Sequence, residues 1–351
     1  MSWVHALARP EIVALRVYEH AAWRPDLVPL HANELPWDPA GGDGRDGLNR
    51  YPEPQPRELI ERLAALYGVS ARALLLGRGS DEAIDLLCRA FCRAGEDAVL
   101  VCPPTFGMYA VSARIQGAAV IEAPLRPEQG FALDEAAVLE RCARTTKLVF
   151  LCSPNNPTGN LLAERSMLRI ARELAGRALV VIDEAYIEFS GRASLARRLE
   201  EFPNLAVLRT LSKAYGLAGA RCGALLADPQ IIALLAKIIP PYAIPRLTLS
   251  AALSRLSPQS LEAGRAQLAA LLAERSRLQG ALAALPGITR LWPSDANFVL
   301  AEFADADGAL RRAASAGLLV RDARGYPGLG RALRISIGTS EQNARLLESW
   351  S

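Results

Sequence analysis

Polar and charged residues follow four apolar runs of the sequence, directly after the point where each run ends. The four segments are Gly79-Ser80-Asp81 after residues 73–76, Ser153-Pro154-Asn155-Asn156-Pro157-Thr158-Gly159 after 148–152, Asp183-Glu184-Ala185-Tyr186 after 178–182, and Leu211-Ser212-Lys213-Ala214-Tyr215 after 206–210. Ligands of open parallel sheets bind beyond the carboxyl ends of the strands. We therefore expect one site that contains a helix start, an amide, a carboxylate, a phenol and a lysine amine.

This set of groups suits a ligand with a phosphate, a basic ring nitrogen and a carbonyl. A glycine-flanked helix start at Ser80 presents free backbone N–H groups and the positive end of a helix dipole to a phosphate. Thr210, Ser212 and Arg221 can add donors to the same anion. A carboxylate at the end of a buried strand, such as Asp183, needs a cationic partner. Together with an amine, these features describe a site for pyridoxal phosphate.

The amine has few alternatives, because the chain contains only three lysines, Lys147, Lys213 and Lys237. Lys147 opens an apolar run at its N-terminal end, and Lys237 lies in an apolar helix. Neither follows a strand end. Lys213 is therefore the expected nucleophilic amine.

Composition excludes several other classes of protein. The 351 residues suggest about two domains, and 51% hydrophobic with 22% charged residues is typical of a globular chain. A net charge of +3 is too small to indicate a nucleic-acid or membrane surface. No apolar run is long enough for a transmembrane helix, and the N-terminus lacks the apolar core of a secretory signal, which predicts a cytoplasmic protein. The six cysteines indicate buried reduced thiols, and three histidines near the N-terminus give no support for a metal site.

The elements that must position these groups alternate along the chain. We predict an arm with one short helix over residues 1–30, then a loop over residues 36–56. Helices are expected at 58–67, 81–92, 109–116, 133–142 and 163–174, and strands at 73–76, 98–102, 119–123, 148–152, 178–182 and 206–210. Continuous apolar strands separated by helices indicate an α/β fold with a mostly parallel sheet covered on both faces. A long helix at 261–285 then leads to a smaller domain with strands at 298–301, 318–321 and 333–337 and a helix at 306–316.

Several motifs together resemble the fold type I aminotransferases that depend on pyridoxal phosphate. They are Ser153–Gly159, Asp183–Phe189 and Thr210–Gly223. Further segments narrow the resemblance to the histidinol-phosphate aminotransferase family, namely Asn49–Pro52, Pro103–Tyr109 and Ser294–Phe298. The likeness runs from about Tyr18 to Thr339. It implies a large domain at 31–245 with a seven-stranded sheet, and a small α+β domain at 246–351 that packs with the N-terminal arm.

The resemblance also implies roles for the cofactor site. Lys213 matches the Schiff-base lysine and general base, and Asp183 matches the partner of the pyridine nitrogen. Asn155 and Tyr186 match the pair that bonds the cofactor's 3′-oxygen, and Tyr109 matches the aromatic residue stacked on the ring. The phosphate-site positions are Ser80, Asp81, Thr210, Ser212 and Arg221, together with Tyr51 reaching in from a second subunit of a homodimer.

Substrate recognition follows from the same resemblance. Arg334 matches the arginine that grips the anionic group of the substrate, and Arg321 matches its helper for the substrate phosphate. Tyr18, Asn33 and Tyr242 match positions that face the substrate. The implied reaction converts L-histidinol phosphate and 2-oxoglutarate to 3-(imidazol-4-yl)-2-oxopropyl phosphate and L-glutamate in histidine biosynthesis, by a ping-pong mechanism.

Three alternatives share parts of this pattern. A decarboxylase of a phosphorylated amino acid would keep every cofactor residue and differ at the arm and Arg334. A broad aromatic aminotransferase would accept donors without a phosphate. A regulator that senses pyridoxal phosphate would need a DNA-binding module, for which the chain leaves no room. Val17, Leu35 and Phe106 depart from the family pattern near the substrate entrance.

Overall fold

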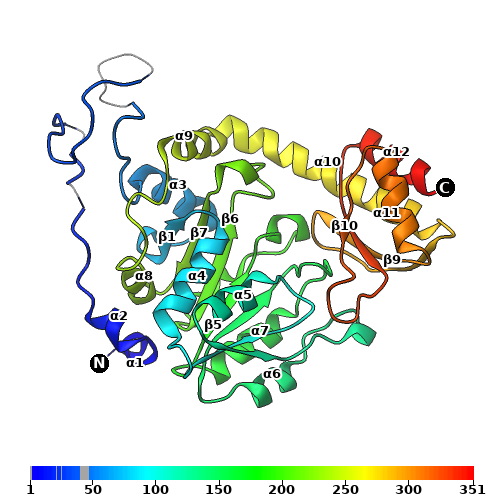
Figure 1. The fold of residues 1–351 in the computed structure, drawn as a ribbon, viewed down its shortest axis with the longest axis horizontal. Helices are drawn as coiled ribbons and strands as arrows, with labels where there is room; N and C mark the ends of the chain where they lie inside the picture. The colour runs from blue at the N-terminus through cyan, green and yellow to red at the C-terminus, as the bar shows by residue number, and fades with distance from the viewer. Residues whose placement is uncertain (1, 21, 25, 40–46) are drawn as a thin grey trace.

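The protein is described here by a computed structural model that covers residues 2–20, 22–24, 26–39 and 47–351. Two sheets lie at opposite ends of the molecule, and long helix α10 runs from one to the other (Figure 1). The loop predicted over residues 36–56 includes residues 40–46, which lie outside the described residues.

The larger sheet has seven strands in the order β1-β7-β6-β5-β4-β2-β3. Its strands are β1 (Leu74–Gly77), β2 (Ala98–Val101), β3 (Ala119–Glu122), β4 (Thr146–Cys152), β5 (Leu179–Asp183), β6 (Leu205–Thr210) and β7 (Gly223–Ala227). All neighbours pair parallel except β7, which is antiparallel to both β1 and β6. The predicted mostly parallel sheet is confirmed, and β7 is the strand that the sequence pattern did not indicate.

Helices cover both faces of this sheet, because successive strand side chains point to opposite sides. Val180 packs in the core beneath one group of helices, and its neighbour Val181 packs in the core on the other face. The first group is α3 (Arg57–Tyr67), α6 (Glu135–Arg141) and α7 (Glu164–Glu173). The second group is α4 (Ser80–Phe91), α5 (Met108–Ile115) and α8 (Pro229–Leu235). All six cysteines are buried and free, as expected.

The smaller sheet is antiparallel, in the order β10-β11-β9-β8. Its strands are β8 (Ile288–Leu291), β9 (Phe298–Phe303), β10 (Arg321–Asp322) and β11 (Ala332–Ser336). The helices of this part of the chain are α9 (Arg246–Arg255), α10 (Pro258–Ala283), α11 (Ala306–Ser315) and α12 (Ser340–Trp350). Leu278 and Leu282 of α10 pack in one core with Val299 and Leu333 of the sheet. The long connecting helix and the smaller unit are thus confirmed, while α9, β8 and α12 were not predicted and β10 lies later than the predicted strand at 318–321. The apolar helix expected to contain Lys237 is α8, which ends at Leu235, so Lys237 lies in the turn that follows it.

The N-terminal segment differs from the expectation of one short helix. It forms two, α1 (Trp3–Leu7) and α2 (Pro10–Ala14). Val4 and Leu7 share a core with Ile84 of α4 and Ile231 of α8. This segment therefore packs on the helices of the larger sheet, whereas we expected the arm to pack with the small domain. Beyond α2 the chain runs along one side of the molecule, apart from both sheets (Figure 1).

Short connections complete the fold. Five 3-10 helices lie between the larger elements, at Ala71–Ala73, Pro127–Gln129, Ile187–Ser190, Leu195–Arg198 and Ala218–Ala220. Within the described ranges of the chain, no helix is both long and apolar enough to cross a membrane.

Candidate functional site

A cavity of about 270 Å³ lies where the carboxyl ends of β4, β5 and β6 meet the smaller sheet. Both sheets contribute to its wall, so the site lies between the two parts of the fold. The residues that line it are Ser80, Asp81, Phe106, Cys152, Asn156, Asp183, Ala185, Tyr186, Thr210, Ser212, Lys213, Arg221, Arg321, Tyr326 and Arg334. The predicted convergence of strand ends on one site is what the structure shows.

Glycines shape one end of this cavity for close approach of a ligand. Gly79 precedes α4 with φ of +83°, a conformation that glycine adopts without strain. A Cβ on Gly79 would lie 2.7 Å from Nη2 of Arg221, and a Cβ on Gly223 would lie 2.6 Å from the carbonyl carbon of Gly79. The first N–H groups of α4, beginning at Ser80, have no partner within the helix. This end is therefore built to receive an anion at a helix N-terminus.

Polar side chains complete the anion-binding end. The Thr210 hydroxyl donates to Oγ of Ser212 over 3.0 Å and accepts from the Ser212 backbone N–H over 3.1 Å. Arg221 reaches Oγ of Ser212 with Nη1 over 3.4 Å and pairs through Nη2 with Asp81 Oδ2 over 3.1 Å. These four predicted phosphate-site residues thus lie together around the start of α4.

Asp183 lies at the end of β5 and is only 3% exposed. Its Oδ1 accepts the backbone N–H of Ala185 over 3.0 Å, and its Oδ2 accepts the hydroxyl of Tyr109 over 2.6 Å. Burial raises the pKa of Asp183 above its ordinary value, and the Tyr109 hydrogen bond opposes that rise. A buried carboxylate in this position suits a cationic ring nitrogen.

Lys213 follows β6 in the same cavity. Its Nζ lies 5.7 Å from the centre of the Tyr186 ring, which in turn meets Phe298 of β9 edge-on. Burial lowers the pKa of Lys213, and the nearby charge of Arg334 lowers it further. A lowered pKa makes this amine a better nucleophile and base near neutral pH.

Two arginines of the smaller sheet face the cavity together. Arg321 of β10 and Arg334 of β11 are register partners in an antiparallel pair. Arg334 also bonds the side-chain oxygen of Asn156 through Nη1, and its guanidinium lies 5.1 Å from the centre of the Phe298 ring. Like charges directly opposite each other destabilise a sheet. A ligand with one or more anionic groups would relieve this repulsion.

Asn155 is not placed as the resemblance implied. It is 1% exposed, its Nδ2 donates to the Pro104 carbonyl oxygen over 2.8 Å and to Thr158 over 2.6 Å, and its Oδ1 accepts from Thr105 over 2.9 Å. The amide is thus occupied in holding the loop. The next residue, Asn156, lines the cavity instead.

Tyr109 is also placed differently from the expectation that it stacks on a cofactor ring. Its side chain is fully buried and stacks on Phe150, with ring centres 4.8 Å apart and planes within 4°. Both faces of the ring are therefore inside the protein. Phe106 lies in the cavity wall, with its ring nearly perpendicular to that of Tyr109 and ring centres 5.6 Å apart. Of these two aromatic residues, Phe106 is the one that lines the cavity.

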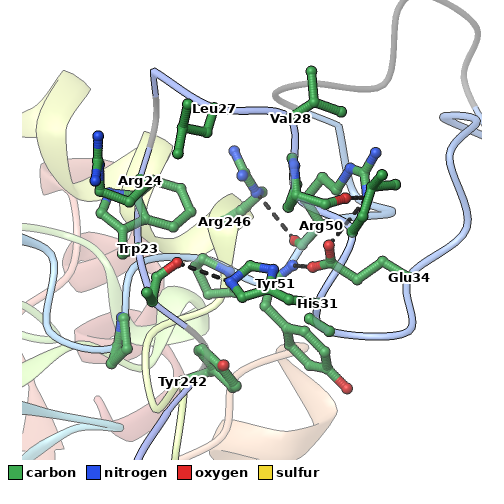
Figure 2. A pocket seen from close by; sticks show the side chains of 16 residues that line it. Trp23, Arg24, Leu27, Val28, His31, Glu34, Arg50, Tyr51, Tyr242 and Arg246 are labelled. Carbon is green, nitrogen blue, oxygen red and sulfur yellow. Dashed lines mark hydrogen bonds and ion pairs between the residues drawn. The ribbon is translucent and has the colours of Figure 1, made fainter.

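The four remaining predicted residues, Tyr18, Asn33, Tyr51 and Tyr242, do not line the cavity that contains Lys213. Tyr51 and Tyr242 stack on each other with ring centres 4.5 Å apart, and both line a second cavity of about 530 Å³ beside the N-terminal segment (Figure 2). Asn33 lies in the adjoining hollow with the same two tyrosines, and Tyr18 is 68% exposed. Within one chain, then, these four residues lie on a surface separate from the Lys213 cavity.

This second cavity combines apolar and cationic side chains. Trp23 and Leu27 line it beside Arg24, Arg50 and Arg246 (Figure 2). In the described part of the chain, most of the large apolar side chains that remain exposed lie in this segment and the loop after it: Leu15, Val17, Tyr18, Trp23, Leu27, Val28, Leu30, Leu35, Trp37, Leu48 and Tyr51. So large an exposed apolar surface is typical of a protein–protein contact.

Five cavity residues were not among the predicted site residues. Asn156 and Ala185 belong to the strand-end segments but were given no role. Phe106 was noted only as a departure from the family pattern, and Cys152 only as a buried thiol. Tyr326 lies in the turn between β10 and β11, where the Tyr-Pro-Gly sequence indicates a turn but not a binding residue. Because this turn follows Arg321 so closely, its position was the only feature of the sequence that could have indicated Tyr326 as a site residue.

The donor set fits pyridoxal phosphate. The glycine-lined start of α4 with Ser212 and Arg221 could hold the phosphate, and buried Asp183 could hold a protonated ring nitrogen. Lys213 supplies the only lysine amine in the cavity wall. Burial of Asp183, together with glycines at 79 and 223 that leave no room for a Cβ beside Arg221 and the start of α4, is the structural support for this fit.

Comparison with known proteins also indicates an aminotransferase. A family model for class I and II aminotransferases matches residues 42–349. Histidinol-phosphate aminotransferase from Stenotrophomonas maltophilia is 50% identical over 353 aligned residues, which cover 99% of this chain and 96% of that protein. The structure of histidinol-phosphate aminotransferase from Sinorhizobium meliloti in complex with pyridoxal-5′-phosphate has a TM-score of 0.77 at 28% identity, with 85% and 81% of the two chains covered.

A more distant structure shows the fold alone. It is the histidinol-phosphate aminotransferase from Clostridium acetobutylicum, with a TM-score of 0.78 at 22% identity and with 86% and 90% of the two chains covered. The family match and the identity extend over almost the whole chain, and they agree with a lysine, a buried carboxylate and an anion cradle around one cavity. The chain belongs to the family of class I and II aminotransferases.

Proposed function

We propose that the protein is a histidinol-phosphate aminotransferase of histidine biosynthesis that uses pyridoxal phosphate. It would transfer the amino group of L-histidinol phosphate to 2-oxoglutarate, giving 3-(imidazol-4-yl)-2-oxopropyl phosphate and L-glutamate. The observation that carries this proposal is the 50% identity, over nearly the full length of both chains, to the enzyme of that name from Stenotrophomonas maltophilia.

The cofactor would occupy the cavity with its phosphate at the start of α4. Ser80 and Asp81 would contribute backbone N–H groups there, while Thr210, Ser212 and Arg221 would contribute side chains. Tyr186 and Asn156, rather than Asn155, would bond the 3′-oxygen, because Asn155 is already engaged in its loop. Phe106 of the cavity wall, rather than buried Tyr109, would lie against the ring. When bound, pyridoxal phosphate supplies an aldehyde that takes up an amino group and a protonated ring that accepts electrons from the substrate.

The reacting proton would be moved by Lys213. Burial and the charge of Arg334 lower the pKa of this lysine. A larger fraction of the amine is then unprotonated near neutral pH and can take the proton from the substrate Cα. Asp183 would hold a proton on the ring nitrogen, since a buried carboxylate strongly favours a cationic partner. The same two residues would serve both halves of a ping-pong reaction.

The substrate's anionic groups would bind Arg334 and Arg321. Their opposed guanidinium groups could grip the phosphate of L-histidinol phosphate in one half-reaction and a carboxylate of 2-oxoglutarate in the other. This double duty needs two cations on one side of the cavity, which is where the structure has them.

We further propose that the protein works as a homodimer in the cytoplasm. The second subunit would cover the exposed apolar surface of the N-terminal segment, and Tyr51 would reach the cofactor phosphate of that subunit. Tyr18, Asn33 and Tyr242 would then face the neighbour's substrate. Their distance from their own Lys213 cavity supports this arrangement, and so does the apolar character of the surface. The division into an arm at 1–30, a large domain at 31–245 and a small domain at 246–351 belongs to the same proposal.

The test compares products and donors. The protein, loaded with pyridoxal phosphate, is given L-histidinol phosphate, L-histidinol or L-phenylalanine, with 2-oxoglutarate as acceptor. We expect L-glutamate to form with the phosphorylated donor at a kcat/KM at least a hundredfold higher than with the others. Equal rates for all donors would indicate a broad aromatic aminotransferase. A fourth donor, L-threonine O-3-phosphate, tests the decarboxylase, because release of carbon dioxide from it without L-glutamate formation would indicate that activity.

A further inference from the structure

Tyr109 contacts the carboxylate of Asp183 from inside the protein. Its hydroxyl donates to Oδ2 over 2.6 Å, while the backbone N–H of Ala185 donates to Oδ1 over 3.0 Å. Each carboxylate oxygen thus has a donor from the protein. The cavity is left as the remaining direction from which a third donor can reach Asp183.

The position of the Tyr109 hydroxyl is fixed by packing. The ring is fully buried, lies parallel to Phe150 with ring centres 4.8 Å apart, and is nearly perpendicular to the ring of Phe106 with ring centres 5.6 Å apart. A buried aromatic ring held on two sides cannot turn without disturbing its neighbours. Its O–H group therefore points at Asp183 whether or not the cavity is filled.

We propose that Tyr109 is a positioning residue that acts through Asp183. By donating a hydrogen bond from a fixed ring, it holds the carboxylate in one orientation and stabilises its negative charge, so that Asp183 can keep a proton on the ring nitrogen of the cofactor. This inference rests on the proposed use of pyridoxal phosphate. It replaces the stacking role that the sequence suggested for Tyr109.

The electrostatics of the pair favour this direction of the hydrogen bond. Burial raises the pKa of the Tyr109 hydroxyl well above its ordinary value, and the charge of Asp183 raises it further, so the phenol keeps its proton. Burial raises the pKa of Asp183 as well, and the hydrogen bond from Tyr109 is the largest effect that lowers it. Asp81 opposes ionisation of Asp183 and Lys213 favours it, both as weaker effects.

The test distinguishes the contribution of the ring nitrogen to binding from that of the rest of the cofactor. Cofactor-free wild-type and Tyr109→Phe protein are titrated with pyridoxal phosphate and with its 1-deaza analogue, in which carbon replaces the ring nitrogen. The substitution keeps the aromatic ring and removes the hydroxyl. A hydrogen bond to a charged group contributes enough that we expect affinity for pyridoxal phosphate to fall on the order of tenfold. Affinity for the analogue should change less than about twofold, because it has no nitrogen for Asp183 to hold.

Phe106→Leu is the matched control, because it removes the aromatic face and should weaken both ligands alike. Equal weakening of both ligands by Tyr109→Phe would overturn the inference, since it would indicate general damage to the cavity. No change with either ligand would overturn it too. Thermal melting of the cofactor-free variants checks that each is folded. Failure of the wild-type protein to bind pyridoxal phosphate would instead contradict the proposed function.

Discussion

Arg209 ties together the turns that carry the reactive residues, and its loss should destabilise the protein measurably. It lies on β6 with a side chain that is 7% exposed. One guanidinium nitrogen bonds Glu188 over 2.6 Å, another lies 3.6 Å from Glu184, and the group lies 4.3 Å from the centre of the Tyr67 ring. Glu184 directly follows Asp183, and Glu188 lies two residues after Tyr186. This buried cation therefore stabilises the segment after β5 that carries Asp183 and Tyr186.

The expected magnitude follows from what Arg209→Met leaves behind. Glu184 is 2% exposed and would remain buried without its cation, and removing one partner of a buried ion pair costs about 3–5 kcal/mol. Unfolding entropy of about 2.1 cal/mol/K per residue, over 351 residues, converts this to a loss of about 4–7 °C in Tm. Protein and cofactor concentrations must be held constant, because ligand binding and association shift Tm.

The loss should also depend on pH. Burial raises the pKa of Glu184 to about 6, although Arg209 opposes the rise. A carboxyl group whose pKa is higher in the folded than in the unfolded protein destabilises the fold as pH rises through that range. Without Arg209 the folded pKa of Glu184 rises further, so the difference in Tm between wild type and variant should grow from pH 5 to pH 8.

The assay is thermal unfolding of wild type, Arg209→Met, the double variant Glu184→Gln/Arg209→Met, and Arg265→Met. Arg265 is a control from an exposed ion pair with Glu262 and should lower Tm by less than about 1 °C. The double variant should recover part of the loss, because no buried charge remains at residue 184. Equal losses from the two arginine variants, or a loss that is constant from pH 5 to pH 8, would refute the reasoning.

Two substitutions test other parts of the site, and one labelling experiment tests the core. Gly79→Ala should weaken binding of pyridoxal phosphate at least tenfold, since the new Cβ would lie 2.7 Å from Arg221 Nη2 at a φ of +83°. Gly68→Ala, which is also at positive φ but in open space, controls for backbone strain. Equal affinities in both variants would contradict the proposed phosphate site at Gly79. Arg334→Gln should lower kcat/KM for L-histidinol phosphate by about a hundredfold or more, because the charge-assisted pair between Arg334 and the substrate phosphate is lost. L-Glutamate formation measures this value. An unchanged kcat/KM would show that Arg334 does not bind the substrate. The six cysteines should not react with a thiol reagent at pH 8 until the protein unfolds, since burial raises the pKa of thiols such as Cys92 to about 12. Rapid labelling of the native protein would contradict their burial.

The sequence predicted the sheet and the strand ends because both rest on local patterns. Runs of four or five mostly apolar residues predict the parallel strands, and polar residues directly after them mark the carboxyl edge. This rule brought Lys213 and Asp183 to one site, and the family resemblance implied their roles. Strand β7, at Gly223–Ala227, was not predicted, because a five-residue apolar run after a glycine-rich segment gives no sign of its direction.

The two residues placed wrongly show where motif reasoning ends. Asn155 and Asn156 are adjacent and identical in type, and only the loop geometry decides which amide faces the cavity. Phe106 and Tyr109 lie three residues apart, and the choice between them depends on where α5 begins. Neither choice is encoded in spacing, since each depends on how the loop packs against strands that are distant in sequence.

The arm could not be placed from the sequence for a different physical reason. Tyr18 and Tyr51 lie on a segment that leaves large apolar side chains exposed in one chain. In the proposed homodimer, their surroundings would depend on the second subunit. A single sequence contains the residue types of such a contact but not its geometry.

The most direct test of the central claim is a single half-reaction followed by absorbance. Purified protein loaded with pyridoxal phosphate is mixed with L-histidinol phosphate alone, with no keto-acid acceptor. The account predicts that the yellow absorbance of the bound cofactor is lost as one equivalent of 3-(imidazol-4-yl)-2-oxopropyl phosphate forms per site, and that 2-oxoglutarate restores it. Lys213→Ala should give neither change, and Lys147→Ala should give both. A yellow protein that does not respond to L-histidinol phosphate, or a protein that takes up no cofactor, would contradict the account.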